Sequence, residues 1–307
     1  MSTNLEADEK MMCCAGCGKA EVDDIKLRKC NGCKSVRYCG VKCQREHRPK
    51  HKRECKNRVA ELRDELLFKQ PESSHLGDCP ICFLPLPLDP QKCQFMACCS
   101  KLVCEGCEYA NQKREIEQRL HPACPFCRHP APESKEEADK NVMKRVEAND
   151  PVAMFHIGKK RCDEGDFDGA FEYWTKAAEL GDAGSHYNLS NMYDKGEGVE
   201  KDEKKQVYHL EEAAIGGEVD ARLNLAKFEW DNGRRERAVK HWIIAVNFGH
   251  DFALKSLRDI YTKTKGLLSK EDFAAALRAH QAAVDATKSP QREVADAYIS
   301  RLRCRFP

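Results

Sequence analysis

Cysteines are the residues whose type and spacing point to chemistry in this chain. The 307-residue sequence holds 19 of them, and 17 lie between Cys13 and Cys127. Most come in pairs separated by two or three residues, a spacing that lets two thiolates reach one metal ion. No basic-then-apolar signal segment opens the chain, so we expect a reducing compartment, where such pairs hold metal rather than form disulfides. The first 130 residues therefore predict zinc binding.

The first group of candidate ligands consists of four pairs. They are Cys14 and Cys17, Cys30 and Cys33, Cys39 and Cys43, and His51 and Cys55. Eight such ligands suit two tetrahedral zinc ions with four ligands each. Two alternatives stay open, with Cys13 in place of Cys14 or with His47 as a ligand, although His47 is more simply interpreted as an exposed helical histidine.

The stretch RYCGVKCQREHRPKHKREC gives this first group a resemblance to the MYND zinc finger. The resemblance implies interleaved sites, with Cys14, Cys17, Cys39 and Cys43 on one ion and Cys30, Cys33, His51 and Cys55 on the other. It also implies a peptide-binding module, whose ligands often contain proline. The chain departs from the family at Arg48, where the family usually has tryptophan three residues before the histidine.

This module is strongly basic. Residues 26–63 hold 14 Lys and Arg against three Glu, a local charge of +11. Cations near a thiolate-rich zinc site partly offset its negative charge, which is the plainer interpretation. A more specific interpretation is that the basic module binds an acidic or phosphate-bearing partner.

A second group of pairs follows. They are Cys79 and Cys82, Cys98 and Cys99, Cys104 and Cys107, and Cys124 and Cys127. Residues 79–127 resemble a RING finger, which implies one ion on the first and third pairs and one on the second and fourth. The second pair is irregular, because its cysteines are adjacent and Lys101 stands where the family has histidine. Adjacent residues of an extended chain point to opposite sides, so this pair needs a local turn. Cys93 and His121 are the alternative ligands.

The RING resemblance also implies a docking site for a ubiquitin-conjugating enzyme. Ile81 and Pro125 match the walls of the family's shallow apolar groove, and Arg128 matches the cation that hydrogen-bonds both the conjugating enzyme and ubiquitin. Such a ligase acts by orienting the thioester rather than through a chemical group of its own. Each residue also has a structural interpretation: Ile81 in the core, Pro125 in a turn and Arg128 on the surface.

The last segment repeats itself. Gly181, Gly217 and Gly249 are 36 and then 32 residues apart, and a periodic apolar position falls at Ile157, Leu189, Leu225 and Leu257. Periods of this size predict a solenoid of helix pairs, with small residues where helices touch (Ala177, Ala213, Ala245) and glycine after each second helix. The stretch GDAGSHYNLSNMYDKGEGVEKDEKKQVYHLEEAAIGG resembles Sel-one-like repeats, which are related to tetratricopeptide repeats.

The expected fold class is two small zinc-stabilised α+β modules followed by an all-α helical-repeat solenoid. The expected parts are a MYND-type finger (13–57), a helical connector (58–72), a RING-type finger (76–130), a linker of disordered composition (131–141), and repeats with a C-terminal capping helix (142–307).

The expected function is that of an adaptor-type RING ubiquitin ligase with about four structural zinc ions. The RING would dock a conjugating enzyme, while the MYND finger and the concave face of the repeats would bind substrate. The alternative is a non-catalytic interaction scaffold, for example in transcription or chromatin. A net charge of +2 argues against bulk nucleic-acid binding, and no apolar run is long enough to span a membrane. We expect a cytoplasmic or nuclear protein.

Overall fold

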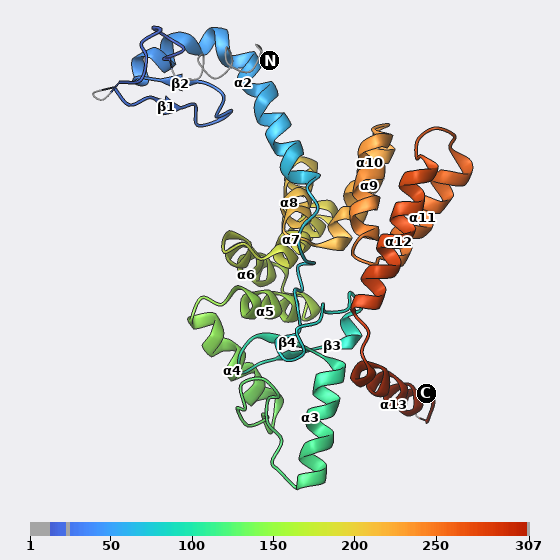
Figure 1. The fold of residues 1–307 in the computed structure, drawn as a ribbon. Helices are drawn as coiled ribbons and strands as arrows, with labels where there is room; N and C mark the ends of the chain where they lie inside the picture. Colours follow the sequence, from blue (N-terminus) through green and yellow to red (C-terminus); the bar gives the residue numbers. More distant parts are fainter. Residues whose placement is uncertain (1–12, 23–24, 306–307) are drawn as a thin grey trace. The chain divides into compact units, whose positions relative to one another are not determined.

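The computed structural model describes residues 13–22 and 25–305, with the side chains of residues 302–305 left out. The chain divides into two compact units, Met1–Lys69 and Gln70–Pro307 (Figure 1).

The first unit is a small finger on a long helix. Strands β1 (Arg28–Lys29) and β2 (Arg37–Tyr38) pair antiparallel, and α2 runs from Val41 to Leu67. Its core consists largely of thiols, with Leu27 and Tyr38 packed among Cys14, Cys30 and Cys33. Helix α2 continues without a break through residues 58–67, so the first part of the expected connector is an extension of the finger's own helix.

The second unit begins with another cysteine-rich module. A short 3₁₀ helix, η1 (Pro90–Lys92), leads into the antiparallel hairpin of β3 (Cys93–Met96) and β4 (Lys101–Cys104), and α3 (Glu105–Gln118) follows at once. Leu86, Met96 and Val103 are buried among its cysteines. A hydrophobic core this small stabilises a fold only weakly, and small domains commonly use structural metal ions as the additional cross-links.

The rest of the second unit is a helical solenoid, and the expected fold class is confirmed. Its helices are α4 (Lys135–Glu147), α5 (Pro151–Asp163), α6 (Phe167–Glu179), α7 (Ala183–Lys195), α8 (Glu203–Ile215), α9 (Val219–Asp231), α10 (Arg235–Val246), α11 (Asp251–Lys263) and α12 (Lys270–Ala286). Helices α5 to α12 pack as four consecutive pairs. None of the described helices is long and apolar enough to cross a membrane.

The repeat pattern maps onto these pairs as the sequence predicts. Ala177, Ala213 and Ala245 are fully buried, which lets paired helices approach closely. Gly181, Gly217 and Gly249 have φ of +89°, +87° and +83°, the left-handed conformation that ends a helix at little cost for glycine.

The expected disordered linker is wrong in its second half. Ser134 accepts a hydrogen bond from the Glu137 N–H, and the Glu137 carboxylate accepts one from the Glu133 N–H. This reciprocal cap starts α4 at Lys135, although the residues around it have the composition of a connector.

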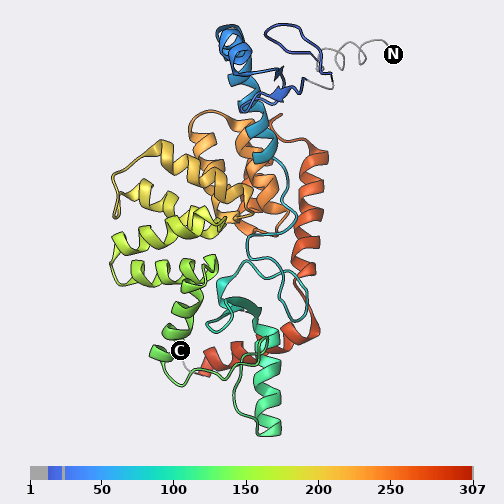
Figure 2. The same cartoon turned by 90° about the vertical axis from the view of Figure 1, so that its left-hand side faces the viewer.

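The expected C-terminal helix is present, but it does not cap the repeats. Helix α13 (Pro290–Arg305) packs on α3 of the cysteine-rich module, not on the last helix pair. Figure 2 shows the chain leaving α12 and returning to α3. The tyrosine rings of Tyr109 and Tyr298 are 4.9 Å apart, and Lys92 pairs with Asp296 at 2.8 Å.

Residues 70–100 run along the ends of the repeats where their first helices begin. The His75 N–H donates to the Gly217 carbonyl at 2.9 Å, and the His75 side chain pairs at 3.0 Å with Glu218, which caps α9. On the hairpin, the Phe95 ring stacks on His156 of α5 at 3.6 Å. The cysteine-rich module of the second unit is therefore attached to the solenoid at several points.

Candidate metal centres

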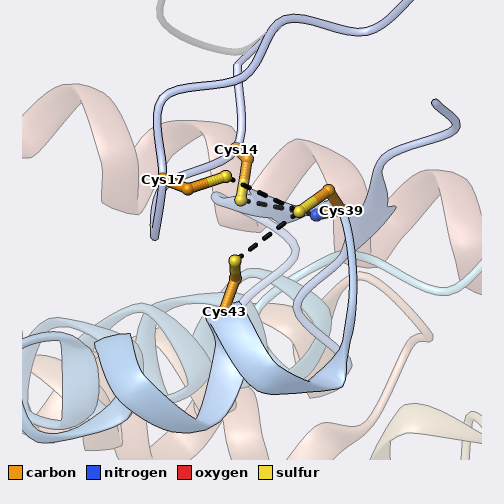
Figure 3. Close-up of side chains that lie close together, drawn as sticks. All are labelled: Cys14, Cys17, Cys39 and Cys43. Atoms are coloured by element: carbon orange, nitrogen blue, oxygen red, sulfur yellow. Dashed lines mark hydrogen bonds between the residues drawn. The ribbon is translucent and has the colours of Figure 1, made fainter.

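The first cluster joins the N-terminal turn of the finger to the start of α2 (Figure 3). Cys39 lies just before α2 and Cys43 in its first turn, while Cys14 and Cys17 lie on a separate turn. The Cys39 sulfur is 3.6 Å from that of Cys17 and 3.5 Å from that of Cys43. Gly16 permits this approach, because a Cβ there would lie 2.7 Å from the Cys43 Cβ.

The second cluster lies between a turn and the middle of α2. Cys30 and Cys33 come from the turn, and His51 and Cys55 from neighbouring turns of the helix. The Cys33 sulfur is 3.2 Å from His51 Nε2, and the Cys30 and Cys55 sulfurs are 3.8 Å apart. Cys13 and His47 belong to neither cluster, and His47 instead meets the Tyr38 hydroxyl at 3.1 Å.

The third cluster is the most deeply buried in the described chain. Cys79 and Cys82 lie on a turn, Cys104 ends β4, and Cys107 lies in the first turn of α3. The Cys82 and Cys104 sulfurs are 3.8 Å apart, and the Cys104 N–H donates to the Cys79 sulfur at 3.5 Å.

The fourth cluster contains the adjacent pair. Residues 97–100 form a tight turn after β3, in which the N–H groups of Cys99 and Ser100 both donate to the Met96 carbonyl. The turn brings Cys98 to 3.3 Å from Cys127 and Cys99 to 3.9 Å from Cys124. Neither alternative ligand joins this cluster, because Cys93 lies on β3 with its sulfur 3.7 Å from the Pro87 carbonyl and His121 is exposed.

The four clusters fit tetrahedral zinc. All ligand atoms of a cluster lie within 4.8 Å of one another. A tetrahedron with Zn–S bonds of about 2.3 Å has S–S edges of about 3.8 Å, close to the 3.3–3.9 Å contacts in these clusters. No described cysteine is disulfide-bonded.

Several thiols in each unit have a lowered pKa, and the shift is large for Cys79 and Cys14. The Cys104 thiol and the N–H groups of Cys104, Cys82 and Ile81 hydrogen-bond Cys79 and lower its pKa to about 4, although burial opposes this. Burial also raises the pKa of Cys14, but N–H groups led by that of Cys39 outweigh it and bring the value to about 6. The thiolate is the form that binds metal.

The three candidate docking residues lie on the two loops attached to α3. Ile81 and Pro125 are half-buried, each between two cysteines of a pair. Arg128 donates to Asn111 Oδ1 of α3 at 2.7 Å, while Asn111 Nδ2 donates to Glu115 and to the Ala123 carbonyl. Sequence reasoning missed this buried Asn111–Glu115 pair, whose only signal is two polar residues one helical turn apart.

Sequence reasoning also missed Arg292 of α13. Its guanidinium is buried in the first loop of the second cysteine-rich module, where it donates to the Leu84 and Pro85 carbonyls and to the Cys82 sulfur. The backbone of α13 comes so close to α3 that a Cβ on Gly106 would lie 3.0 Å from Arg292 Cα. No local sequence signal could have placed Arg292 there.

Two families match the chain in part. The MYND finger matches residues 14–55, and the Sel1 repeat matches residues 152–182 and 183–218. These matches confirm the MYND resemblance and the repeats. They leave out residues 79–127, so the RING resemblance is not shown. No curated protein matches the chain significantly.

Solved repeat proteins show similarity to the solenoid. A Sel1 repeat protein from Oxalobacter formigenes is 21% identical with a TM-score of 0.43, over 57% of this chain and 71% of that one. A protective antigen of uropathogenic Escherichia coli with an SLR fold is 21% identical with a TM-score of 0.38, over 64% of this chain and 40% of that one. MYND fingers and Sel1 repeats are generally protein-interaction modules, so this chain is a zinc-finger protein suited to protein partners.

Proposed function

We propose that this chain, which carries a MYND finger and Sel1 repeats, is a zinc-stabilised adaptor whose second cysteine-rich module docks a ubiquitin-conjugating enzyme. The sixteen residues of the four clusters would hold four zinc ions. Every position on each ion would be filled by a protein ligand, so the metal would be structural rather than catalytic.

The observation that carries this proposal is the interleaving of the third and fourth clusters around α3. The first loop, with Ile81, is tied to the start of α3 through the third cluster, and the last loop, with Pro125, is tied to it through Asn111. This arrangement supports a docking surface built from both loops. Phe83 and Phe126, which follow Cys82 and Pro125, are 77% and 42% exposed and add apolar area there.

Helix α13 leaves the last loop of this surface accessible, although its Arg292 contacts the first loop. It contacts α3 at Gly106 and Tyr109, whereas Asn111 is two residues further along and faces the last loop. Two residues turn a helix by about 200°, so α13 and the last loop lie on different sides of α3. A conjugating enzyme would then be held next to partners bound by the repeats, and its thioester would be oriented toward them.

The second candidate is a scaffold without transfer activity. The hydrogen bond between Arg128 and Asn111 favours this candidate, because it uses the candidate ubiquitin-contacting cation for a contact within the module. A guanidinium has five donors, so this bond alone does not exhaust Arg128.

Autoubiquitination by the purified full chain, with a panel of conjugating enzymes and with bound zinc quantified, tests the proposal. We expect Ile81→Ala to abolish transfer at unchanged zinc content. Ile116→Ala on α3, which is 79% exposed, is the control and should retain activity. Arg128 has a positive φ of 63°, which asparagine tolerates. The Arg128→Asn variant should lower the transfer rate. Four zinc ions with no transfer across the panel would favour the scaffold.

A further inference from the structure

A pocket of about 430 Å³ opens at the second cluster of the finger, and the cluster's Cys30, His51 and Cys55 form part of its lining. Helix α2 forms one wall, with Gln44, Arg48, Lys52 and Lys56 among its lining residues. The turn at residues 30–32 and the Tyr38 side chain form the other wall. No acidic residue lines the pocket.

The three cations of this wall are spaced by four residues, so they lie on one face of α2, with neighbours about 6 Å apart at the Cβ atoms. Arg48, Lys52 and Lys56 are exposed, and none forms an ion pair within the described part of the chain. Further along the helix, by contrast, Arg58 is paired with two glutamates.

The zinc site does not account for this charge. A zinc ion with three thiolates and one imidazole carries a formal charge of about −1. The three cations therefore leave an excess of positive charge around a concave surface, and that surface has room for a side chain of a partner.

We propose that this pocket binds a phosphorylated side chain of a partner peptide. A phosphate offers three acceptor oxygens and about two negative charges, so it can bond two or three clustered cations at once. The Gln44 amide is a further donor in the lining. Nucleic acid is the less suitable ligand, since it presents a row of phosphates to an extended basic surface, whereas these cations converge on one pocket.

The proposal rests on the interaction role of the MYND finger but not on ubiquitin transfer. The phosphopeptide proposal and the ubiquitin-transfer proposal can therefore fail separately. Loss of peptide binding and loss of transfer are measured in different assays and map to different units of the chain.

The test is fluorescence anisotropy of the zinc-loaded full chain with a degenerate eight-residue peptide pool carrying a central phosphoserine. Its unphosphorylated twin, and a twin with glutamate in place of phosphoserine, are the ligand controls. We expect the phosphorylated pool to bind at least tenfold more tightly than either twin, with an affinity that falls as salt increases.

The pocket variant is Arg48→Gln, Lys52→Gln and Lys56→Gln combined, which keeps helix-forming side chains of similar length. The matched control removes three exposed cations of the same helix that do not line the pocket, through Lys42→Gln, Lys50→Gln and Arg53→Gln. We expect the pocket variant to lose the phosphate preference and the control to keep it, at equal zinc content.

Two results would overturn the proposal. One is equal binding of the phosphorylated and unphosphorylated pools. The other is an equal loss in the two triple variants, together with tighter binding of a 20-nucleotide single-stranded DNA than of the phosphopeptides. That pattern would identify a diffuse nucleic-acid surface instead.

Discussion

Two adjacent cysteines can bind one ion only where the backbone reverses direction at them. Ser100 provides the reversal here, with a φ of 55°, and closes the turn through its N–H bond to the Met96 carbonyl. Cys93 is excluded from the cluster because it lies in the regular ladder of β3, paired with Cys104. The proposed ligand set at this site is thus decided by one turn.

We predict that Cys99→Ser lowers bound zinc from about four ions per chain to about three. A serine hydroxyl is a poor replacement for a thiolate, and three remaining ligands hold zinc weakly. Cys93→Ser is the matched control and should leave the zinc content unchanged. Zinc quantified by mass spectrometry of the native protein measures both variants, and loss of an ion in the Cys93 variant alone would assign the site differently.

At the scale of elements, α13 completes a module that lies far from it in the sequence. Arg292 and Cys82 are 210 residues apart, yet they are 3.4 Å apart in space. The guanidinium donates to the Pro85 carbonyl and the Cys82 sulfur, and it gives the Leu84 carbonyl a second donor besides the Cys79 N–H. Because the same loop carries Ile81, the position of α13 bears on the proposed docking surface.

We predict that Arg292→Gln destabilises the second cysteine-rich module by about 2–3 kcal/mol, because buried carbonyls and a thiolate lose a charged donor. Hydrogen exchange of residues 79–107 should speed up, and ubiquitin transfer should fall if the proposed docking is right. Arg301→Gln, an exposed cation of the same helix, is the control. Unchanged exchange in the Arg292 variant would show that α13 is only an attached helix.

Another prediction at the scale of elements concerns the contact between β3 and α5. Burial, with a smaller contribution from Lys159, lowers the pKa of His156 to about 4. In the unfolded chain this histidine has its ordinary pKa near 6.5, so below that pH the unfolded state binds the proton first. The stabilisation is therefore complete above about pH 6.5 and is lost progressively as the pH falls toward 4, by up to about 3 kcal/mol.

The His156→Phe variant isolates this effect, because its ring can still stack on Phe95 but cannot ionise. Urea unfolding of the wild type and the variant between pH 7.5 and 5 should show the wild type losing more stability. Parallel pH dependence of the two proteins would mean that other groups, such as the cysteine clusters, dominate the acid response.

For the whole molecule, local patterns were predictable and long-range contacts were not. Pair spacing groups the cysteines and the repeat period places Leu189 and Leu225 in the core, since both depend on neighbours a few residues or one repeat away. The interleaving of the clusters came from family resemblance, not from spacing. The return of α13 to Gly106 and the α4 helix inside a polar segment escaped prediction. The position of α13 depends on contacts between residues far apart in the sequence, which no local pattern reveals. Helix α4 forms because the cap made by Ser134 and Glu137 outweighs the linker-like composition of the segment.

The two kinds of core also differ in what stabilises them, and zinc removal separates them. The finger and the second cysteine-rich module bury thiols, whereas the largest repeat cluster, with Val219, Trp242 and Leu257, contains no cysteine. We predict that a strong chelator abolishes hydrogen-exchange protection in residues 13–55 and 79–127 and leaves most of the protection of residues 183–263. Helix α13 should lose protection with the second module, because its partner is α3.

A mass-spectrometric exchange series at increasing chelator concentration measures this directly, and zinc added back should restore both modules. The attachments of the module to the repeats, at His75 with Glu218 and Phe95 with His156, are few compared with the contacts between helix pairs. The repeats should therefore keep their own cooperative unfolding. Simultaneous loss of protection in the repeats would show instead that the module and the solenoid form a single cooperative unit, with zinc stabilising the whole of residues 70–305.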